Sequence, residues 1–327
     1  MPTAPSIQEF DIPTANSQPA DIATGPDGAL WFTERASARI GRITTAGQVT
    51  EFPLTAGSQP DGITLGPDGK LWFTEAGSSK IGRITKRGRI KEFPTPTYGS
   101  APTRITAGPD GNLWFTESLG SKIGRVTTAG DITEFFTHVP STNPEDITVG
   151  PDGALWFTMF PDPEGMVPGW VGRITTDAQI TLFPTQGKDE DVVSPLGIAS
   201  GPDGNLWITG PGNGTIGRVT TAGTVTAFDL PDGVASSPAF ITARGKALWF
   251  TEAGLGAGRP RLGPDGGLGA AGLTELGNKI ARITTDGTIH ELDVPTPGSS
   301  PTGIALGPSR QIWFTEMAAN QIGEVMF

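Results

Sequence analysis

The stretch GPDGALWFTE at 25–34 decides the fold, because close copies of it recur along the whole chain. Its tryptophan returns six more times, at successive intervals of 41, 42, 42, 51, 42 and 64 residues. A period of about 42 residues built from short strands is typical of a β-propeller blade, and the two longer intervals indicate insertions. The seven tryptophans are Trp31, Trp72, Trp114, Trp156, Trp207, Trp249 and Trp313.

The second copy shows the four strands that one blade needs. We expect strands at 61–66, 70–75, 80–85 and 89–94, with the hairpin turn GPDG between the first two and KRG between the last two. No stretch of the chain has the apolar periodicity of a helix. The repeats therefore predict an all-β chain, a seven-bladed β-propeller of four-stranded blades.

The two ends of the chain predict how the ring closes. The last copy stops at IGEVMF (322–327), after its third strand, and a matching fourth strand, SIQEFDIP, stands at 6–13. The N-terminal strand is therefore expected to complete the last blade and remove the open sheet edge. On this interpretation residues 1–327 form one propeller domain.

Composition excludes several classes of function. The chain has 34 Asp and Glu against 23 Lys and Arg, a formal net charge of −11, and no cysteine. An acidic protein is a poor partner for nucleic acid, and no apolar run reaches the roughly 18 residues that a membrane helix needs. With no basic and apolar leader at its start, the chain is expected to be cytoplasmic, or secreted if a leader has been removed. We expect a monomer.

The repeated motif itself is predicted to be scaffold. The Asp of GPDG suits turn chemistry better than calcium binding, because each turn offers few oxygens. Tryptophan is expected to pack between blades. A Glu after WFT and an Arg in the next strand suggest structural ion pairs. The glutamates are Glu34, Glu75, Glu117, Glu252 and Glu316, and the arginines are Arg42, Arg83, Arg125, Arg173, Arg218 and Arg282.

Three insertions all fall on one predicted face of the ring. They occupy 159–170, 186–194 and 252–278, either after the second strand of a blade or before the first. Elaborated loops on a rigid scaffold usually carry a binding site, so we expect function on this face. Neutral drift in tolerant loops is the alternative interpretation.

Each blade opens with the pattern P-x-x-I, and its two variable positions are predicted to ring the mouth of the central funnel. Blades two to four place Asp61, Arg104, Glu145 and Asp146 there, a carboxylate cluster with one cation. The carboxylates Asp61, Glu145 and Asp146 are candidate ligands for Mg²⁺ or Ca²⁺, which prefer oxygen. The first positions are Ala20, Asp61, Thr103, Glu145, Leu196, Ala239 and Thr302, and the second are Asp21, Gly62, Arg104, Asp146, Gly197, Phe240 and Gly303.

The remaining blades give the predicted mouth an apolar side. Leu196, Ala239 and Phe240 stand at these positions in blades five and six. An apolar wall opposite a few polar groups is typical of a small-molecule pocket. We therefore expect a small-molecule or glycan ligand, with Asp21 and Thr302 also contributing to its site.

The units IGRITTAGQVTEFPL (40–54) and GPDGALWFTE resemble those of the streptogramin B lyase (virginiamycin B lyase) family along essentially the whole chain. The resemblance implies a seven-bladed propeller that linearises a cyclic depsipeptide antibiotic by elimination across its ester, with Mg²⁺ and a histidine base. It also implies functional histidines at the first variable positions of the last two blades, where this chain has Ala239 and Thr302. A family glutamate falls on Glu316 or, one residue on, Met317.

This departure bears directly on chemistry, because neither Ala239 nor Thr302 can act as a base near neutral pH. His290 lies in a predicted outer strand and is expected to face solvent. His138 precedes the fourth blade on the elaborated face, so it joins Asp61, Glu145 and Arg104 as a candidate catalytic residue.

Three functions remain open on the sequence. The first is a lyase-like propeller that binds a ligand in its funnel without the antibiotic lyase's histidines. The second is related elimination or hydrolysis on another substrate, with a carboxylate base and an arginine or metal electrophile. The third is a protein-interaction platform built on the long inserts. The sequence favours the first.

Overall fold

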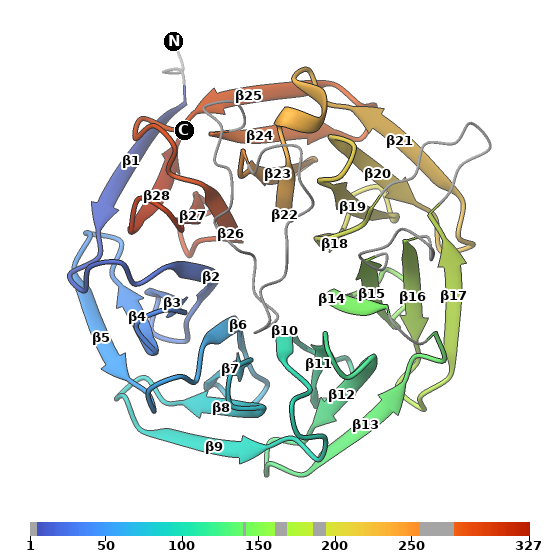
Figure 1. Cartoon of the computed structure of the whole chain (residues 1–327). Coiled ribbons are helices and arrows are strands. Elements are labelled where there is room, and N and C mark those ends of the chain that lie inside the picture. Colours follow the sequence, from blue (N-terminus) through green and yellow to red (C-terminus); the bar gives the residue numbers. More distant parts are fainter. Residues whose placement is uncertain (1–4, 140–141, 161–168, 186–193, 255–277) are drawn as a thin grey trace.

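The computed structural model of the chain describes residues 5–139, 142–160, 169–185, 194–254 and 278–327. These residues form seven four-stranded antiparallel sheets arranged as blades around a central axis (Figure 1). The predicted seven-bladed propeller is confirmed. The only helical element among the described residues is the one-turn η1 (Gly233–Ala235), and none of them forms a helix long and apolar enough to cross a membrane.

Blades one to four follow the chain directly, each from its innermost strand to its outermost. Their strands are β2 (Pro19–Thr24), β3 (Leu30–Glu34), β4 (Arg39–Ile43) and β5 (Val49–Pro53); β6 (Pro60–Leu65), β7 (Leu71–Glu75), β8 (Lys80–Ile84) and β9 (Ile90–Pro94); β10 (Pro102–Ala107), β11 (Leu113–Glu117), β12 (Lys122–Val126) and β13 (Ile132–Phe136); and β14 (Asn143–Val149), β15 (Leu155–Phe160), β16 (Trp170–Ile174) and β17 (Ile180–Pro184).

Blades five to seven continue the pattern, and the last of them closes the ring. Their strands are β18 (Ile198–Ser200), β19 (Leu206–Gly210), β20 (Thr215–Val219) and β21 (Val225–Asp229); β22 (Pro238–Arg244), β23 (Ala247–Glu252), β24 (Lys279–Thr284) and β25 (Ile289–Asp293); and β26 (Pro301–Leu306), β27 (Ile312–Glu316), β28 (Gln321–Met326) and β1 (Ser6–Asp11).

The N-terminal strand supplies the outer edge of the seventh blade, as predicted. β1 pairs antiparallel with β28 in a register that runs from Ser6 opposite Met326 to Asp11 opposite Gln321. Both ends of the chain therefore lie in the same blade (Figure 1). This pairing removes the free edge that an open sheet would expose to other chains.

The antiparallel order gives the ring two faces. The funnel face carries the first residues of each innermost strand and the ends of each second strand, and the turn face carries the GPDG turns. Most of the three predicted insertions lies outside the described residues, namely 161–168, 186–193 and 255–277. The strands that flank them, β15, β17 and β23, all end on the funnel face.

The GPDG turns are held by the side chains of their aspartates. In the first blade the Trp31 indole N–H donates to Asp27 Oδ1 over 3.1 Å, and Arg42 Nε donates to Asp27 Oδ2 over 2.7 Å. The indole ring stacks on Phe52 of its own blade, with ring centroids 5.4 Å apart, and packs in one apolar cluster with Phe73 of the next. The expected turn role of Asp and the expected inter-blade packing of Trp are both confirmed.

The predicted ion pairs between the repeated Glu and the repeated Arg are wrong. The register of the first blade places Arg42 opposite Trp31, and Glu34 opposite Arg39, at the other end of the strand. Arg42 therefore reaches the Asp of the turn instead. In the fourth blade Arg173 makes the same contact with Asp152 at 2.6 Å.

The repeated glutamates are instead buried carboxyl groups on the funnel side of each blade. Burial, the largest cause, raises the pKa of Glu34 and Glu75 to about 7, and raises the pKa of Glu117, Glu252 and Glu316 to about 8. A nearby glutamate of the outermost strand adds to each shift, as Glu134 does for Glu117. These groups belong to the scaffold and hold protons near neutral pH.

One residue of the repeat joins every blade to the next. In the third blade the hydroxyl of Thr116 accepts the Arg104 N–H at 3.0 Å and donates to the Glu145 carbonyl of the following blade at 2.8 Å. The same two bonds recur in all seven blades, the last reaching Ala20 of the first. The fully buried threonines of this hydroxyl ring are Thr33, Thr74, Thr116, Thr158, Thr209, Thr251 and Thr315.

Candidate functional site

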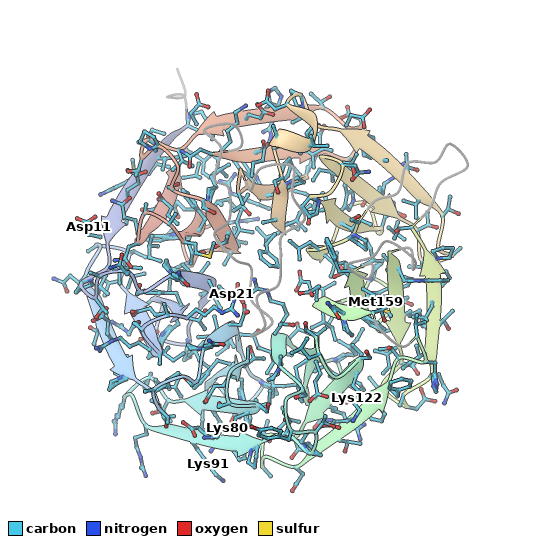
Figure 2. The ribbon with its side chains drawn as sticks, in the orientation of Figure 1. Asp11, Asp21, Lys80, Lys91, Lys122 and Met159 are labelled. Atoms are coloured by element: carbon cyan, nitrogen blue, oxygen red, sulfur yellow. The ribbon has the colours of Figure 1, made fainter. Side chains whose placement is uncertain are left out.

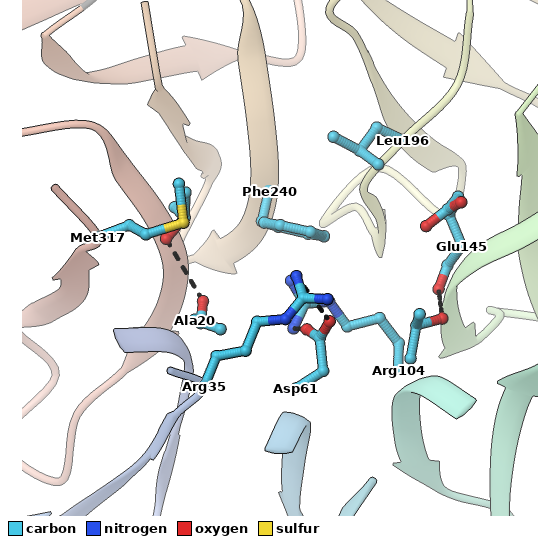
Figure 3. Close-up of a pocket in the computed structure, with 10 residues that line it drawn as sticks. Ala20, Arg35, Asp61, Arg104, Glu145, Leu196, Phe240 and Met317 are labelled. Carbon is cyan, nitrogen blue, oxygen red and sulfur yellow. Dashed lines mark hydrogen bonds and ion pairs between the residues drawn. The ribbon is translucent and has the colours of Figure 1, made fainter. Parts of the chain in front are cut away.

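A cavity opens at the centre of the funnel face. Its enclosed volume is about 30 Å³, so its inner end has room for little more than a water molecule. Six of the seven first variable positions line it, together with residues from the ends of β3, β10, β22 and β27 (Figure 3). Its lining comprises Ala20, Arg35, Asp61, Thr103, Arg104, Glu145, Leu196, Phe240, Thr302 and Met317.

The local backbone explains why these positions face the channel. Between the Pro and the Ile of P-x-x-I the register with the second strand shifts, as between Pro102 and Ile105. The two variable residues therefore form a bulge, a feature that re-aims side chains. The hydroxyl ring holds the bulge, because Thr116 binds the N–H of Arg104 and the carbonyl of Glu145. The scaffold thus uses backbone atoms at these positions and leaves the side chains free to differ.

An ion cluster occupies the centre of the cavity. Arg104 Nη1 lies 3.0 Å from Asp61 Oδ1 and 3.4 Å from Asp21 Oδ2, and Arg35 Nη1 lies 3.9 Å from Asp61 Oδ2. All four side chains are largely buried, and Figure 3 shows both guanidinium groups close to Asp61. The carboxylates of Asp21 and Asp61 hold the pKa of Arg104 above its ordinary value despite its burial. The cluster is a fixed pair of positive charges balanced by carboxylates.

One contact spans the channel and divides it. The Arg104 guanidinium of blade three lies 3.8 Å from the ring centroid of Phe240 in blade six, a cation–π contact in a desolvated place. A second cavity of about 350 Å³ lies on the turn-face side and shares these two residues with the first. Arg104 and Phe240 therefore form the floor of the funnel.

Two of the predicted ligand-binding residues have structural roles. Asp21, which lies near the centre of the ring in Figure 2, accepts the N–H groups of Ile22 and Ile63, both at 2.9 Å. Asp146 accepts those of Ile147 and Ile198, both at 2.8 Å. Each carboxylate thus joins its own blade to the next. Burial raises the pKa of Asp21, and raises that of Asp146 to about 6, although Arg104 opposes both shifts.

Glu145 is a predicted site residue that lines the cavity and combines a titratable group with an oxygen that no described residue binds. It is 6% exposed, and its Oε1 has no hydrogen-bond partner among the residues that the structure describes. Burial, followed by the charge of Asp61, raises its pKa well above the ordinary value, because both disfavour the charged carboxylate. Glu145 therefore offers the cavity a carboxyl oxygen that the described protein leaves unbound.

The apolar side of the cavity comes from three blades. Leu196 and Phe240 line it together with Met317, while Ala239 is 1% exposed and buried in the same cluster as Leu196 and Phe240. Thr302 lines the cavity as well. Its hydroxyl is engaged with Thr315 Oγ1 at 2.9 Å and the Ala20 carbonyl at 3.4 Å, so it is part of the scaffold.

Three other residues lie away from the cavity. His138 is exposed beyond the end of β13, its ring edge-on to Phe136 at a centroid distance of 5.8 Å. His290 is exposed on the outer strand β25, as expected. Glu316 is fully buried and equivalent to Glu117 of blade three, and only its neighbour Met317 reaches the cavity lining.

The predicted metal ligands do not fit a divalent cation. Asp61 is bound to two guanidinium groups, both oxygens of Asp146 accept backbone N–H groups, and burial disfavours the charged form of Glu145. Within the described ranges, no three acidic or histidine side chains are grouped so that they could hold a metal ion. Arg104 and Arg35 supply the positive charge at this site.

The sequence also holds a signal outside the P-x-x-I pattern that was missed. The residue directly after the Glu of LWFTE varies between blades in the same way as the two bulge positions. It is Arg35 in the first blade and Met317 in the seventh, and both line the cavity. A comparison of the copies at this position would have found both.

Comparison with known proteins decides the family. The sequence profile described as the Virginiamycin B lyase family matches residues 5–266 and 261–327. The chain belongs to this family. A virginiamycin B lyase of Nocardia farcinica is 30% identical over 177 residues, which is 48% of this chain and 59% of the relative. The matched region thus spans under two thirds of that relative's length.

Solved structures of family members extend the likeness to the whole ring. Virginiamycin B lyase from Staphylococcus aureus, in its selenomethionine form, is 35% identical with a TM-score of 0.84, covering 99% of this chain and 100% of that one. A catalytically inactive histidine-to-alanine variant of that enzyme, solved with quinupristin, is 36% identical with a TM-score of 0.84 and the same coverage. The family contains carbon–oxygen lyases, and a homologue binds a streptogramin.

Proposed function

We propose that this propeller binds a small molecule at its funnel mouth without opening streptogramin B rings. The observation that carries the proposal is the pair Ala239 and Thr302. The first has no titratable group, and the second has its hydroxyl bound to the scaffold. Elimination next to a carbonyl needs a base with a pKa near the working pH, and no such base stands at these positions.

The homologue from Staphylococcus aureus supports a separation of binding from catalysis. Its histidine-to-alanine variant is described as catalytically inactive and was solved with quinupristin. Loss of a histidine in that enzyme is therefore compatible with a bound ligand. The family resemblance implies histidines at the positions of both Ala239 and Thr302, so we infer that this chain also keeps the bulge scaffold without the base.

The cavity favours a ligand that is apolar on one side and forms hydrogen bonds on the other. Leu196, Phe240 and Met317 offer apolar contact, and Glu145 opposite them offers a carboxyl group with an unbound oxygen. The enclosed volume admits only a small group, such as a carbonyl or a methyl, so the body of the ligand lies over the mouth. A depsipeptide or another amide- or ester-rich molecule has this character.

Calorimetric titration with quinupristin, paired with mass analysis of the recovered ligand, tests the proposal. We expect saturable binding, and an intact ring after prolonged incubation with Mg²⁺. Leu196→Ala should weaken binding, whereas Leu54→Ala, a partly buried residue of an outer connection, should not. Multiple turnovers to the linear product would overturn the absence of catalysis, and the lack of any saturable binding would overturn this ligand class.

A second candidate function rests on Glu145 alone. A buried carboxyl with a raised pKa and a free oxygen can act as a general acid or base, and the nearby guanidinium groups can stabilise an oxyanion. Elimination or hydrolysis of another ester would use these groups. Turnover of an ester panel that Glu145→Gln abolishes, with ligand affinity retained, would favour this function over simple binding.

The interaction-platform hypothesis remains a prediction of the sequence. It depends on the insertion at 252–278, of which 255–277 lies outside the described residues. Deletion of 255–277 tests it directly. Retained quinupristin binding together with loss of a protein partner would support it.

A further inference from the structure

The turn face departs from the repeat where blades six and seven meet. Five blades carry GPDG between their first two strands, but blade six has ARGK (243–246) and blade seven has GPSR (307–310). Both substitutions remove the aspartate and introduce an arginine, in a chain of net charge −11. The difference places Arg244 and Arg310 on adjacent turns.

Direct contacts tie these two turns to the last residue of the seventh blade. Arg244 Nε donates to the carbonyl oxygen of Arg310 at 2.5 Å. The Arg244 guanidinium also lies 3.6 Å from the ring centroid of Phe327, and that ring stands edge-on to Trp249 at 5.2 Å. The two turns therefore form one surface with a fixed guanidinium at its centre.

A third arginine belongs to the same surface. Arg282 on β24 stands in register with Trp249, which is the position that Arg42 has opposite Trp31 in blade one. Arg42 pairs with the turn aspartate, and Arg125 of blade three reaches the Thr176 carbonyl of the next blade. Neither partner exists for Arg282, because its turn lacks the aspartate and no turn joins β28 to β1.

Arg282 is consequently left with an unused donor. Its Nε is buried and has no hydrogen-bond partner among the described residues. No described residue forms an ion pair with Arg244, Arg282 or Arg310. Burial, and then the charges of Arg310 and Arg282, lower the pKa of Arg244. Mutual repulsion within the cluster is therefore not offset by the protein.

The position that an arginine occupies in the other blades is acidic in blade seven, and its side chain lies on the other face of that blade's sheet. Glu324 takes the arginine position in blade seven, in register with Trp313. Trp313 packs with Leu30 and Phe32 of blade one, so Glu324 faces away from blade six. Burial alone raises its pKa, and no cation contributes to that shift.

The backbone of Arg310 provides an independent observation. Its φ is +65°, the left-handed region that GPDG turns fill with glycine, as Gly28 does at +72°. A side chain in this region costs about 1 kcal/mol or more. Arginine is thus present at a position where the turn itself favours glycine.

We propose that Arg244, Arg282 and Arg310 form an anion site on the turn face that binds a phosphate group. Three guanidinium groups that form no ion pair with a described residue, one of them with a buried unused N–H, match the charge and the several acceptor oxygens of a phosphate. The aromatic surface of Phe327 borders the site. The site is separate from the funnel, which opens on the opposite face.

Calorimetric titration of the whole protein with inorganic phosphate, at constant ionic strength adjusted with chloride, tests this site. We expect saturable 1:1 binding in the wild type. Arg282→Gln should weaken it about tenfold, because it removes a charge-assisted donor. Arg42→Gln, the matched arginine of blade one with its own aspartate partner, should leave it unchanged.

Arg310→Gly keeps the test valid if Arg282→Gln fails to fold. It restores the glycine of the repeat, so the variant should be at least as stable as the wild type and yet bind phosphate more weakly. Equal phosphate affinity in wild type and Arg310→Gly, or no saturable phosphate binding at all, would overturn the proposal. Quinupristin binding should be the same in all these variants.

Discussion

Two neighbouring positions of each blade behave in opposite ways. The threonine of the second strand is the same in all seven copies and fully buried, whereas the bulge residues that its hydroxyl holds differ in almost every copy. Thr116, for example, binds the N–H of Arg104 and the carbonyl of Glu145. The constant position therefore serves the scaffold through its side chain in every blade, whereas the variable positions serve it in every blade through their backbone and only in some blades through their side chains.

This difference explains how one ring can carry unlike chemistry around its mouth. A change from Glu145 to Leu196 between blades four and five alters the cavity but leaves the carbonyl bond from the threonine in place. Because the hydroxyl ring binds backbone atoms, the residues that contact a ligand can change without loss of the bonds that join the blades. It also locates the variation at a bulge, where side chains are already aimed inward.

Replacing a threonine of the hydroxyl ring should have the largest effect on the free energy of unfolding. Thr116→Val removes the hydroxyl, so the buried Arg104 N–H loses its acceptor and the Glu145 carbonyl keeps only the Thr103 hydroxyl, which loses its own bond to Thr116. We expect a loss of about 4 kcal/mol in the free energy of unfolding, since each such group costs about 1–3 kcal/mol. Urea unfolding followed by tryptophan fluorescence measures it. Thr106→Val, on the same blade's innermost strand β10 and outside the hydroxyl ring, is the control and should cost under about 1 kcal/mol.

The sequence predicted the ring better than it predicted the contacts inside it. The spacing of the tryptophans and the residues of the turns are enough to predict seven blades, because they belong to a local pattern that recurs from copy to copy. The Glu–Arg pairing failed because strand register is a pairwise property, and Arg42 lies opposite Trp31 rather than Glu34. The role of threonine was missed because LWFT was interpreted by its apolar letters, although its threonine is as constant as its tryptophan.

The sequence predicted which residues line the funnel, but it did not predict the contacts that their side chains make. Asp21 and Asp146 look like ligand groups among the variable positions, yet both carboxylates bind the next blade's backbone. Arg104 likewise looks like a catalytic cation and proves to be fixed between carboxylates and Phe240. Such facts depend on distances between blades, which no local pattern encodes.

Some variable residues therefore matter to the scaffold nearly as much as the constant ones, and Arg104 is the clearest case. Arg104→Met leaves the carboxylates of Asp21 and Asp61 buried with less compensation. We expect a loss of about 3 kcal/mol at pH 7, as for removal of one partner of a buried pair, and a smaller loss at pH 5, because burial already raises the pKa of Asp21 and removal of the guanidinium charge raises it further. Urea unfolding at both pH values checks this. A loss that is equal at pH 5 and pH 7 would contradict the electrostatic origin.

The constant carboxyl groups should make stability depend on pH. Glu117 has a folded pKa of about 8 against an ordinary value of 4.5, so the folded protein holds a proton that the unfolded chain releases between these values. Its contribution is full below pH 4.5 and is lost as pH rises through about 8. Glu117→Gln should therefore reduce the fall in unfolding free energy between pH 5.5 and 7.5 by about 1.4 kcal/mol per pH unit.

The control for this pH dependence of the unfolding free energy is a solvent-exposed carboxylate. Asp131 is exposed in the turn before β13, so Asp131→Asn should leave the slope unchanged. Blades four and five provide a second control within the chain, because Met159 and Gly210 occupy the glutamate position there. A pH slope that Glu117→Gln does not reduce would mean that this carboxyl is ionised in the folded protein.

Replacement of Glu145 should have the smallest effect on stability. It gives the most direct comparison between a variable funnel residue and a constant scaffold residue. Glutamine has the shape of a protonated glutamic acid, and Oε1 of Glu145 makes no hydrogen bond among the described residues, so Glu145→Gln should change the unfolding free energy at pH 7 by under about 0.5 kcal/mol. Glu117→Gln in the scaffold and Glu145→Gln in the funnel make the same chemical change. Only the second should alter quinupristin affinity, because only that carboxyl reaches the cavity. Paired calorimetric titrations of the two variants decide the point, and an equal loss of affinity in both would mean that the scaffold carboxyls also shape the site.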